Sequence, residues 1–243
     1  MHKKIILLFI IMVTVIITGL KSKSESNYQI FTPMTYSYSD DNNECILFIL
    51  DYSQSMNEKI NGISKKDILK YAFYKISNQI PQNEKLGLRV YGHKRGFLIT
   101  QACKASENLV NITTNSCNEI TNVIEKLKPS GMTPITYSLK QAVQKDFVNC
   151  NGLKHIILIT DGGENCDESP CEYAIKLVKE RSDIKIDVIA VDLKNKNDLS
   201  QLECTAFVTN GKIYNANSID DIEFNIIKAI NFDKEVEGKI IPR

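Results

Sequence analysis

CILFILDYSQS, residues 45–55, decides the fold: an apolar run ends in a carboxylate, and two serines follow it. A second stretch, HIILITD at residues 155–161, has the same form. Continuous apolar runs of this length are typical of strands that are covered on both faces of a sheet. We therefore predict two buried strands, Cys45–Asp51 and His155–Asp161, each of which ends in aspartate.

Amphipathic segments alternate with the apolar runs along the chain. Residues 65–80 place their apolar side chains on one helical stripe, and residues 135–147 do so after a turn that contains proline. Further strands are predicted at 86–91, 186–191 and 212–214, further helices at 117–128, 172–181, 198–208 and 219–230, and a short edge strand with a loop in 97–117. This alternation predicts a single α/β domain: a doubly wound, mostly parallel sheet with helices on both faces.

The composition fits one sizeable domain and argues against a nucleic-acid partner. The chain has 243 residues, of which 43% are hydrophobic, enough to bury a full core. Its 30 basic and 29 acidic side chains leave a net charge of +1. This balance provides no broad cationic surface for phosphate groups, so no nucleic-acid binding is expected.

The two ends of the chain lie outside the predicted domain. A basic start precedes an uncharged run from Ile5 to Leu20, which is typical of an export signal and short for a transmembrane helix. An uncleaved membrane anchor is the alternative. The predicted division is a signal peptide at 1–21, a polar tether at 22–43, the domain at 44–231 and a charged tail at 232–243. Either way, the domain is expected outside the cytoplasm, as a periplasmic, secreted or surface-anchored protein.

Seven cysteines agree with an oxidising location, where disulfides form. The odd count leaves at least one thiol without an intramolecular partner. Cys166 and Cys171 flank a short loop and are the first candidate pair, and Cys103 and Cys117 bracket a polar insertion and are the second. Cys45 lies in the apolar strand and is the predicted buried free thiol. Spacing alone does not determine the connectivity.

Three separate segments supply oxygen ligands. Asp51, Ser53 and Ser55 end or follow the first strand, Thr133 lies in a Gly-Met-Thr-Pro turn, and Asp161 ends the second strand. Parallel α/β sheets bind ligands at the carboxyl ends of their strands, near the point where the strand order reverses. All five donors are hard oxygens, which favours Mg²⁺, with Ca²⁺ or Mn²⁺ as alternatives.

The mixture of neutral and charged oxygens predicts how such a site works. If Ser53, Ser55 and Thr133 donate hydroxyls directly to the ion, the ion stays strongly electrophilic. Asp51 and Asp161 then act mainly through bound waters and balance the charge. One coordination position remains for a ligand from outside. A carboxylate of a protein partner suits that position, because it brings the negative charge that the direct ligands lack.

These residues resemble the metal-ion-dependent adhesion site (MIDAS) of the von Willebrand factor type A (VWA) family. Asp51-x-Ser53-x-Ser55 is similar to the DxSxS motif of that family, Thr133 to its separate threonine and Asp161 to its later aspartate. The likeness covers roughly residues 44–231, the whole of the predicted domain. It implies a VWA fold, a metal site formed by all five residues, and non-catalytic, metal-dependent binding of an acidic group on a protein partner.

Other segments resemble exported bacterial VWA proteins labelled as calcium-activated chloride channel homologues, notably Leu88–His93, Gly131–Ile135 and Thr160–Cys166. Two positions depart from the family pattern, because Gln54 stands where glycine is usual and Gly163 where an acidic residue is common. Neither residue is an expected ligand, so the predicted metal site is unaffected.

Three other functions stay open. A magnesium-dependent hydrolase of the phosphatase type also uses aspartates at strand ends, but Ser53 stands where the second aspartate of a nucleophile and acid pair is expected. An ion-channel subunit is disfavoured because the chain has one short apolar segment. A structural VWA domain with an idle metal site is the third. Near the site, Glu164 is interpreted as a solvated loop carboxylate and His93 as a structural histidine.

Overall fold

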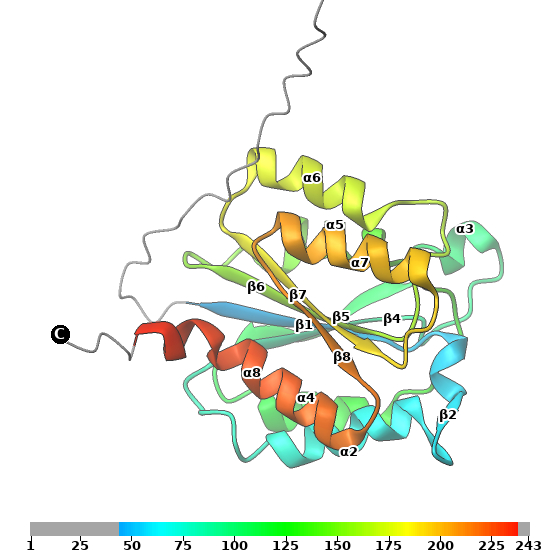
Figure 1. Ribbon diagram of the computed structural model, residues 1–243, viewed down its shortest axis with the longest axis horizontal. Coiled ribbons are helices and arrows are strands. Elements are labelled where there is room, and N and C mark those ends of the chain that lie inside the picture. The colour runs from blue at the N-terminus through cyan, green and yellow to red at the C-terminus, as the bar shows by residue number, and fades with distance from the viewer. Residues whose placement is uncertain (1–43, 238–243) are drawn as a thin grey trace, which may run out of the picture. The chain divides into compact units, whose positions relative to one another are not determined.

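The computed structural model describes residues 44–237, so the predicted export signal and tether lie outside the described residues. Six strands form one sheet in the order β5-β4-β1-β6-β7-β8 (Figure 1). Neighbouring strands are parallel except β4 and β5, which are antiparallel. The strands are β1 Cys45–Asp51, β4 Lys85–Tyr91, β5 Ser106–Thr113, β6 Lys154–Thr160, β7 Ile184–Val191 and β8 Ile213–Ala216.

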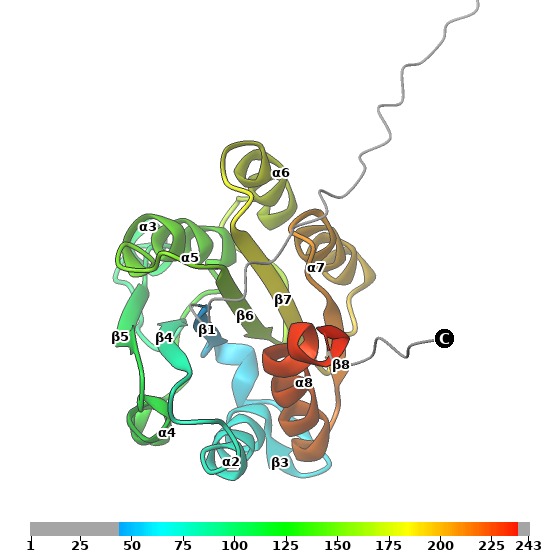
Figure 2. The same cartoon turned by 90° about the vertical axis from the view of Figure 1, so that its left-hand side faces the viewer.

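Helices cover both faces of this sheet. Figure 2 shows α5, α6 and α7 on one side of the strands and α2, α4 and α8 on the other. The helices are α2 Lys65–Ile76, α3 Ile99–Ala102, α4 Cys117–Lys126, α5 Ile135–Gln141, α6 Pro170–Glu180, α7 Lys196–Val208 and α8 Ile219–Glu237. Shorter elements are the 3-10 turn η1 Gln54–Asn57, the hairpin strands β2 Lys59–Ile60 and β3 Ile63–Ser64, and the π-helical turn η2 Ala142–Asp146. Within residues 44–237, no helix has both the length and the hydropathy needed to cross a membrane.

The central strand β1 contributes to both cores. Ile46, Phe48 and Leu50 belong to the apolar cluster under α2, α4 and α8, whereas Leu47 and Ile49 belong to the cluster under α5, α6 and α7. Every residue of β1 is buried. Because both faces of the strand meet a helical layer, its sequence is apolar without alternation.

The predicted architecture, a doubly wound and mostly parallel sheet between helical layers, is confirmed. Four predicted elements differ clearly in extent. The helix predicted at 135–147 is α5 as far as Gln141 and then the π-helical turn η2. Helix α2 ends at Ile76, and residues 77–80 form turns. Ile80 is nevertheless buried, and so its position fits the apolar stripe from which the longer helix was predicted. Residues 97–117 hold the short helix α3 as well as the full edge strand β5. Helix α8 continues past the predicted end at 230, as far as Glu237.

The predicted disulfide pairs, Cys166–Cys171 and Cys103–Cys117, are wrong. The observed pairs are Cys45–Cys150, Cys103–Cys166 and Cys171–Cys204, and the free cysteine is Cys117. The prediction that Cys45 is the free thiol is therefore also wrong, although the expectation of one unpaired cysteine is confirmed.

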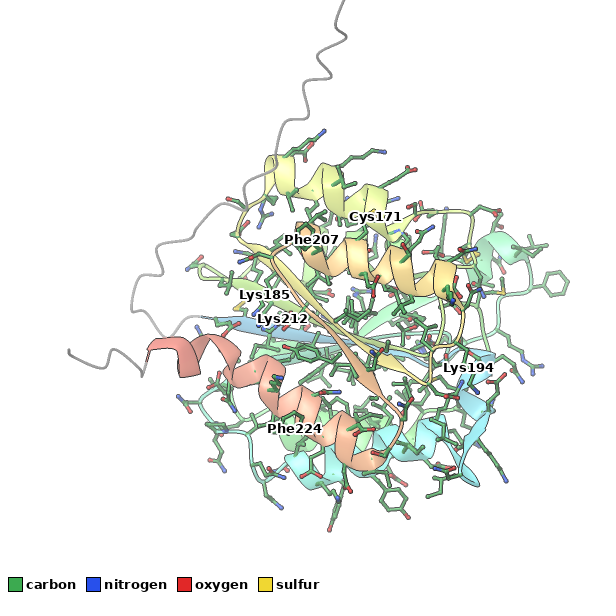
Figure 3. The ribbon with its side chains drawn as sticks, viewed as in Figure 1. Cys171, Lys185, Lys194, Phe207, Lys212 and Phe224 are labelled. Atoms are coloured by element: carbon green, nitrogen blue, oxygen red, sulfur yellow. A yellow bond between two sulfur atoms is a disulfide. The ribbon has the colours of Figure 1, made fainter. Side chains whose placement is uncertain are left out.

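Packing between distant elements explains these disulfide pairs. Cys171 lies in the first turn of α6, which packs beside α7, so its partner is Cys204 of α7 (Figure 3). Cys45 is the first residue of β1 and lies next to the segment that leads into β6. Cys150, its partner, belongs to that segment. The predicted pairs joined cysteines that are close in sequence, whereas the structure joins neighbouring elements of the three-dimensional fold.

A buried charge cluster lies at the amino edge of the sheet. His155 of β6 contacts the Glu44 carboxylate through Nδ1 and the Asp187 carboxylate through Nε2, both at 3.0 Å. Burial disfavours the imidazolium, but hydrogen bonds to Asp187 and Glu44 outweigh burial and raise the pKa of His155. Burial likewise disfavours the Asp187 carboxylate, but its hydrogen bond with His155 outweighs burial and lowers the pKa of Asp187. The cluster therefore favours a charged His155 between two carboxylates.

We expect the substitution His155→Gln to destabilise the fold by about 3 kcal/mol near pH 5.5, because it removes the cation between Glu44 and Asp187 and leaves Asp187 with the more distant ammonium of Lys185, at 3.8 Å. Since the pKa of folded His155 is raised, the stability it contributes is fully present below the unfolded pKa of about 6.5 and is lost as the pH rises through the folded value. The stability contributed by Asp187 is lost only as the pH falls through its lowered pKa. Urea unfolding at about pH 5.5 and about pH 9 measures the difference between wild type and variant.

The substitution His93→Gln is the matched control for this pH dependence. Burial lowers the pKa of His93, so the advantage of wild type over this variant should shrink towards low pH, the opposite trend. An advantage of wild type over His155→Gln that stays constant across this pH range would show that folding does not change the pKa of His155, and one that shrinks towards low pH would show that folded His155 is neutral.

Candidate metal centre

The strands β1 and β6 end side by side at the carboxyl edge of the sheet. The chain passes from β1 to β4 on one side of β1 and returns to β6 on the other, so the strand order reverses between β1 and β6. Asp51 is the last residue of β1, and Asp161 directly follows β6. Both carboxylates therefore lie at the switch point of the sheet, where open α/β folds bind their ligands.

Asp51 is fully buried and held by two hydrogen bonds. The backbone N–H of Ser53 donates to its Oδ1 at 2.7 Å, and the hydroxyl of Thr160 donates to its Oδ2 at 2.8 Å. Burial, followed by repulsion from the charge of Asp161, raises the pKa of Asp51 to about 6, and the hydrogen bonds from Ser53 and Thr160 oppose this rise. The two carboxylates are therefore close enough to interact strongly in a poorly solvated place.

The two serines connect the carboxyl ends of the strands. The hydroxyls of Ser53 and Ser55 lie 3.0 Å apart, and the Ser55 hydroxyl donates to Asp161 Oδ1 at 2.7 Å. The 3-10 turn η1 begins directly after Ser53, with the N–H of Met56 donating to the Ser53 carbonyl. This turn keeps both hydroxyls beside the end of β6.

Thr133 belongs to a loop that is attached to the same place. Its neighbour Gly131 forms a parallel bridge with Ser53, and the Gly131 carbonyl accepts from the N–H of Gln54. The N–H of Thr133 donates to the Asn165 side chain at 2.7 Å. Thr133 is thus held between the loop after β1 and the loop after β6, and its side chain is buried.

Two glycines allow these loops to approach. Gly92 has φ of +73°, and a Cβ there would lie 2.7 Å from the Cα of Ser53. A Cβ on Gly131 would collide with the carbonyl oxygen of Lys94. Only glycine fits at either position, so the close contact among the three loops depends on these two glycines.

The structure therefore brings Asp51, Ser53, Ser55 and Asp161 into one hydrogen-bonded cluster, with Thr133 on a loop bonded to both sides of it. Within residues 44–237, no three His, Cys, Asp or Glu side chains gather in a metal-binding arrangement, so a metal ion here would need the hydroxyls as well as the carboxylates. Hydroxyl and carboxylate oxygens are the donors that Mg²⁺ and Ca²⁺ prefer. The residues present fit a hard divalent cation.

Sequence analysis missed one residue of the cluster, Lys65. Its side chain is buried, and its Nζ donates to Asp161 Oδ2 at 2.8 Å and to Glu58 Oε2 at 2.9 Å. Burial disfavours the ammonium, but hydrogen bonds to Asp161 and Glu58 outweigh burial and raise the pKa of Lys65. Asp161 thus has a permanent positive neighbour inside the site.

A short hairpin explains the position of Lys65. Asn61 and Gly62 both have positive φ, of 51° and 89°, and connect β2 to β3 in a tight turn. Just beyond the hairpin, the N–H of Lys65 donates to the carbonyl of Glu58 at 2.9 Å. This bond holds Lys65, the first residue of α2, where its side chain contacts Asp161 at the end of β6. Asn-Gly is a strong hairpin signal, so the sequence held a clue to this placement.

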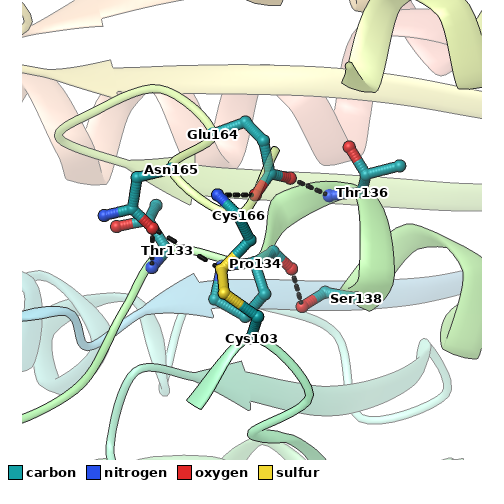
Figure 4. Close-up of a disulfide and its surroundings, with 8 residues drawn as sticks. All are labelled: Cys103, Thr133, Pro134, Thr136, Ser138, Glu164, Asn165 and Cys166. Atoms are coloured by element: carbon teal, nitrogen blue, oxygen red, sulfur yellow. Dashed lines mark hydrogen bonds between the residues drawn. A yellow bond between two sulfur atoms is a disulfide. The ribbon is translucent and has the colours of Figure 1, made fainter. Parts of the chain in front are cut away.

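The loop after β6 is fixed on its other side by a disulfide (Figure 4). Cys166 is bonded to Cys103 at the end of α3. Glu164 of this loop accepts from the N–H of Thr136 at 2.7 Å and from the N–H of Cys166 at 2.9 Å. The interpretation of Glu164 as a solvated carboxylate is therefore wrong: it is half-buried, and burial raises its pKa against the effect of these hydrogen bonds.

One of the two departures from the family pattern, Gly163, has a physical explanation. Gly163 packs against α7, where a Cβ would collide with the carboxyl group of Asp198. An acidic residue at 163 would add charge repulsion to that collision. Gln54 is exposed beside the two serines, so its side chain lies at the surface through which a ligand would approach.

An apolar rim, defined as Phe97, Leu98 and Ile99, lies in the chain between Lys94, which touches Gly131, and Cys103, which is bonded to Cys166. Phe97 is 96% exposed, Leu98 56% and Ile99 76%. The segment just before the rim is fixed to the site, because the Lys94 carbonyl touches Gly131. Figure 1 shows α3, which begins at Ile99, at the same end of the sheet as β2. Large apolar side chains exposed together in this way are typical of interaction surfaces.

Comparisons with known proteins agree with this arrangement. A family profile described as von Willebrand factor type A domain matches residues 44–214. YwmD of Bacillus subtilis (strain 168) is 30% identical over 190 residues, which cover 75% of this chain and 82% of YwmD. YwmC of the same bacterium is 29% identical over 182 residues, which cover 73% of this chain and 79% of YwmC. Both are described as uncharacterized proteins, so neither supports the chloride-channel label.

Solved structures show the same fold at low sequence identity. BatB from Bacteroides thetaiotaomicron has a TM-score of 0.61 and 18% identity, covering 79% of this chain and 98% of BatB. Proximal thread matrix protein 1 from the mussel byssus, solved with a zinc-occupied MIDAS motif, has a TM-score of 0.59 and 21% identity over 79% of this chain and 46% of its own. The pilus adhesin SpaC from Lactobacillus rhamnosus GG has a TM-score of 0.58 and 15% identity over 79% of this chain and 30% of its own.

The profile spans most of the sheet, from β1 to the start of β8, and YwmD matches over most of its length. By sequence as well as by fold, the chain belongs to the von Willebrand factor type A domain family.

Proposed function

We propose that this VWA domain binds a divalent cation through the hydroxyls of Ser53, Ser55 and Thr133, with Asp51 and Asp161 acting through bound waters. Mg²⁺ is the proposed ion, with Ca²⁺ and Mn²⁺ as alternatives. The bound cation supplies an electrophilic position that takes a carboxylate from outside. The proposed function is non-catalytic, metal-dependent binding of an acidic group on a protein partner.

The observation that carries the proposal is the hydrogen-bonded chain from Ser53 through Ser55 to Asp161 at the carboxyl edge. Hydroxyls that already point at each other and at a carboxylate need little rearrangement to converge on one ion. The nearby charge of Asp161 and the burial of Asp51 make a cation favourable at the same place. The zinc-occupied MIDAS motif of the mussel byssus protein supports a metal role for this type of site.

Two features support export. Three disulfides join cysteines that lie between residues 45 and 204, and structural disulfides persist in oxidising compartments. A pilus adhesin is among the proteins with the same fold. The predicted signal peptide and tether agree with an exported domain, and an uncleaved signal would be its contact with a membrane.

The apolar rim supports a protein partner over a small anion. Phe97 and Ile99 are exposed close in sequence to Lys94, whose carbonyl touches Gly131, and offer contact area that a free carboxylate would not use. Arg95 is exposed in the same segment and favours acidic ligands, whereas the neighbouring Lys94 is paired with Glu107 at 2.6 Å. We therefore propose a partner segment that carries an Asp or Glu next to a bulky apolar side chain.

The first prediction concerns the ion. In calorimetric titration with Mg²⁺, we expect Ser53→Ala and Thr133→Ala to weaken binding at least ~10-fold, about 1.4 kcal/mol each, because each removes a direct ligand. Ser77→Ala, which removes a hydroxyl at the far end of α2, should leave the affinity unchanged. Identical isotherms for wild type and both site variants would refute the ligand set.

The second prediction concerns the partner. From a random 12-residue display library, selection in Mg²⁺ with elution by EDTA should enrich peptides with Asp or Glu near a bulky apolar residue. The double substitution Phe97→Ser and Ile99→Ser should weaken these peptides about 10-fold, because it removes apolar contact area, and leave Mg²⁺ binding intact.

Phe207→Ser provides the matched control, since Phe207 is also exposed but lies near the end of α7 (Figure 3). This variant should bind the selected peptides like wild type. If EDTA elutes no peptides enriched in Asp or Glu, or if turnover of a phosphate ester depends on Mg²⁺ and Asp51, the adhesive role is wrong.

A further inference from the structure

Lys65 is the one buried cation that directly contacts the proposed metal centre within the described residues. Its side chain is 4% exposed, and the Asp161 carboxylate that it contacts is 0% exposed. Its second partner, Glu58, is 68% exposed and so is largely screened by solvent. The strong interaction is therefore the buried one, between Lys65 and Asp161.

This contact changes the charge that an incoming ion meets. Asp161 accepts from Lys65 at Oδ2 and from Ser55 at Oδ1, so both of its oxygens are engaged. Asp51 and Asp161 carry two negative charges, and Lys65 carries one positive charge, which leaves one net negative charge among the three buried groups. A divalent ion is therefore only half compensated by this cluster.

The remaining positive charge has a consequence for binding. Repulsion between Lys65 and a divalent ion in a poorly solvated site weakens binding of the ion alone. Once the ion is bound, the surplus positive charge attracts an anion more strongly than a neutral cluster would. The negative charge of an acidic ligand then neutralises the surplus positive charge that Lys65 leaves in the loaded site.

We propose that Lys65 is a resident cation that lowers the intrinsic affinity of the site for divalent ions and so makes binding of the ion and binding of an external carboxylate mutually dependent. This inference rests on the proposed function, since it assumes that the ion binds beside Asp161. The dependence is reciprocal, because two ligands that strengthen each other do so by the same factor.

Lys65 is a positioning residue for charge and not a ligand. The β2–β3 hairpin and the bond from its own N–H to the Glu58 carbonyl hold its backbone in place, and the contacts of its ammonium with Asp161 and Glu58 hold the side chain. A purely structural ion pair would have the same geometry. The two roles differ in what happens to ion affinity when the positive charge is removed.

Calorimetric titration of the purified protein with Mg²⁺ separates these roles. Lys65→Met keeps the length of the side chain and removes its charge, and we expect at least ~10-fold tighter binding of Mg²⁺ in chloride buffer. Lys65→Arg keeps the charge and should bind like wild type. Lys75→Met, the same substitution at an exposed ion pair of the same helix, should also bind like wild type.

A second measurement needs no variant and so does not depend on how Lys65→Met folds. Replacing chloride with acetate at constant ionic strength should strengthen binding of Mg²⁺ to wild type several-fold, on the order of 5-fold. The same exchange should have a smaller effect on Lys65→Met, whose loaded site has no surplus charge.

The possible results separate this inference from the proposed function. If wild type binds Mg²⁺ and Lys65→Met binds it equally or more weakly, Lys65 is structural and the inference is overturned alone. An absent acetate effect on wild type that binds Mg²⁺ also overturns it alone. If neither protein binds Mg²⁺ in either buffer, the proposed function is wrong and the inference falls with it.

Discussion

Repulsion between two buried carboxylates is the constraint on which the site depends. The parallel pairing of β1 with β6 brings Asp51 and Asp161 to the same edge, and burial keeps water from screening them. Such an arrangement is unfavourable unless positive charge is supplied. The chain supplies one charge itself, through Lys65, and on the proposed function a divalent ion supplies the rest. The strands, the hairpin and the glycine contacts can be understood as the means of keeping these groups together.

Much of this could be predicted from the sequence, because the signals were local. Apolar runs with a final aspartate identified β1 and β6, and helical stripes identified α2 and α5. Parallel strands that end in carboxylates predict a shared edge, so the convergence of Asp51 and Asp161 followed from the alternation of strands and helices. The place of Ser53 and Ser55 beside Asp51 could be predicted because they lie two and four residues after the end of β1.

The features that were missed or wrong depend on tertiary contacts. Disulfide partners are set by which elements pack together, so Cys103 could not be matched with Cys166 before α3 was placed beside the loop after β6. Glu164 has a buried role because the N-terminus of α5 faces it, and a loop sequence carries no sign of that. In the sequence, Lys65 is the first residue of a predicted amphipathic helix, which gives no sign of a role in the site. Its side chain reaches the site because of the register of the Asn-Gly hairpin.

The most direct test of the central claim is a crystal structure of the protein in MnCl₂, with data collected for anomalous scattering from manganese. The account predicts one strong anomalous peak about 2.2 Å from the hydroxyl oxygens of Ser53, Ser55 and Thr133, with Asp51 and Asp161 separated from it by water. It also predicts that Lys65 still contacts Asp161 with the ion in place. A peak at another part of the surface, or no peak among these hydroxyls at saturating manganese, would contradict the account.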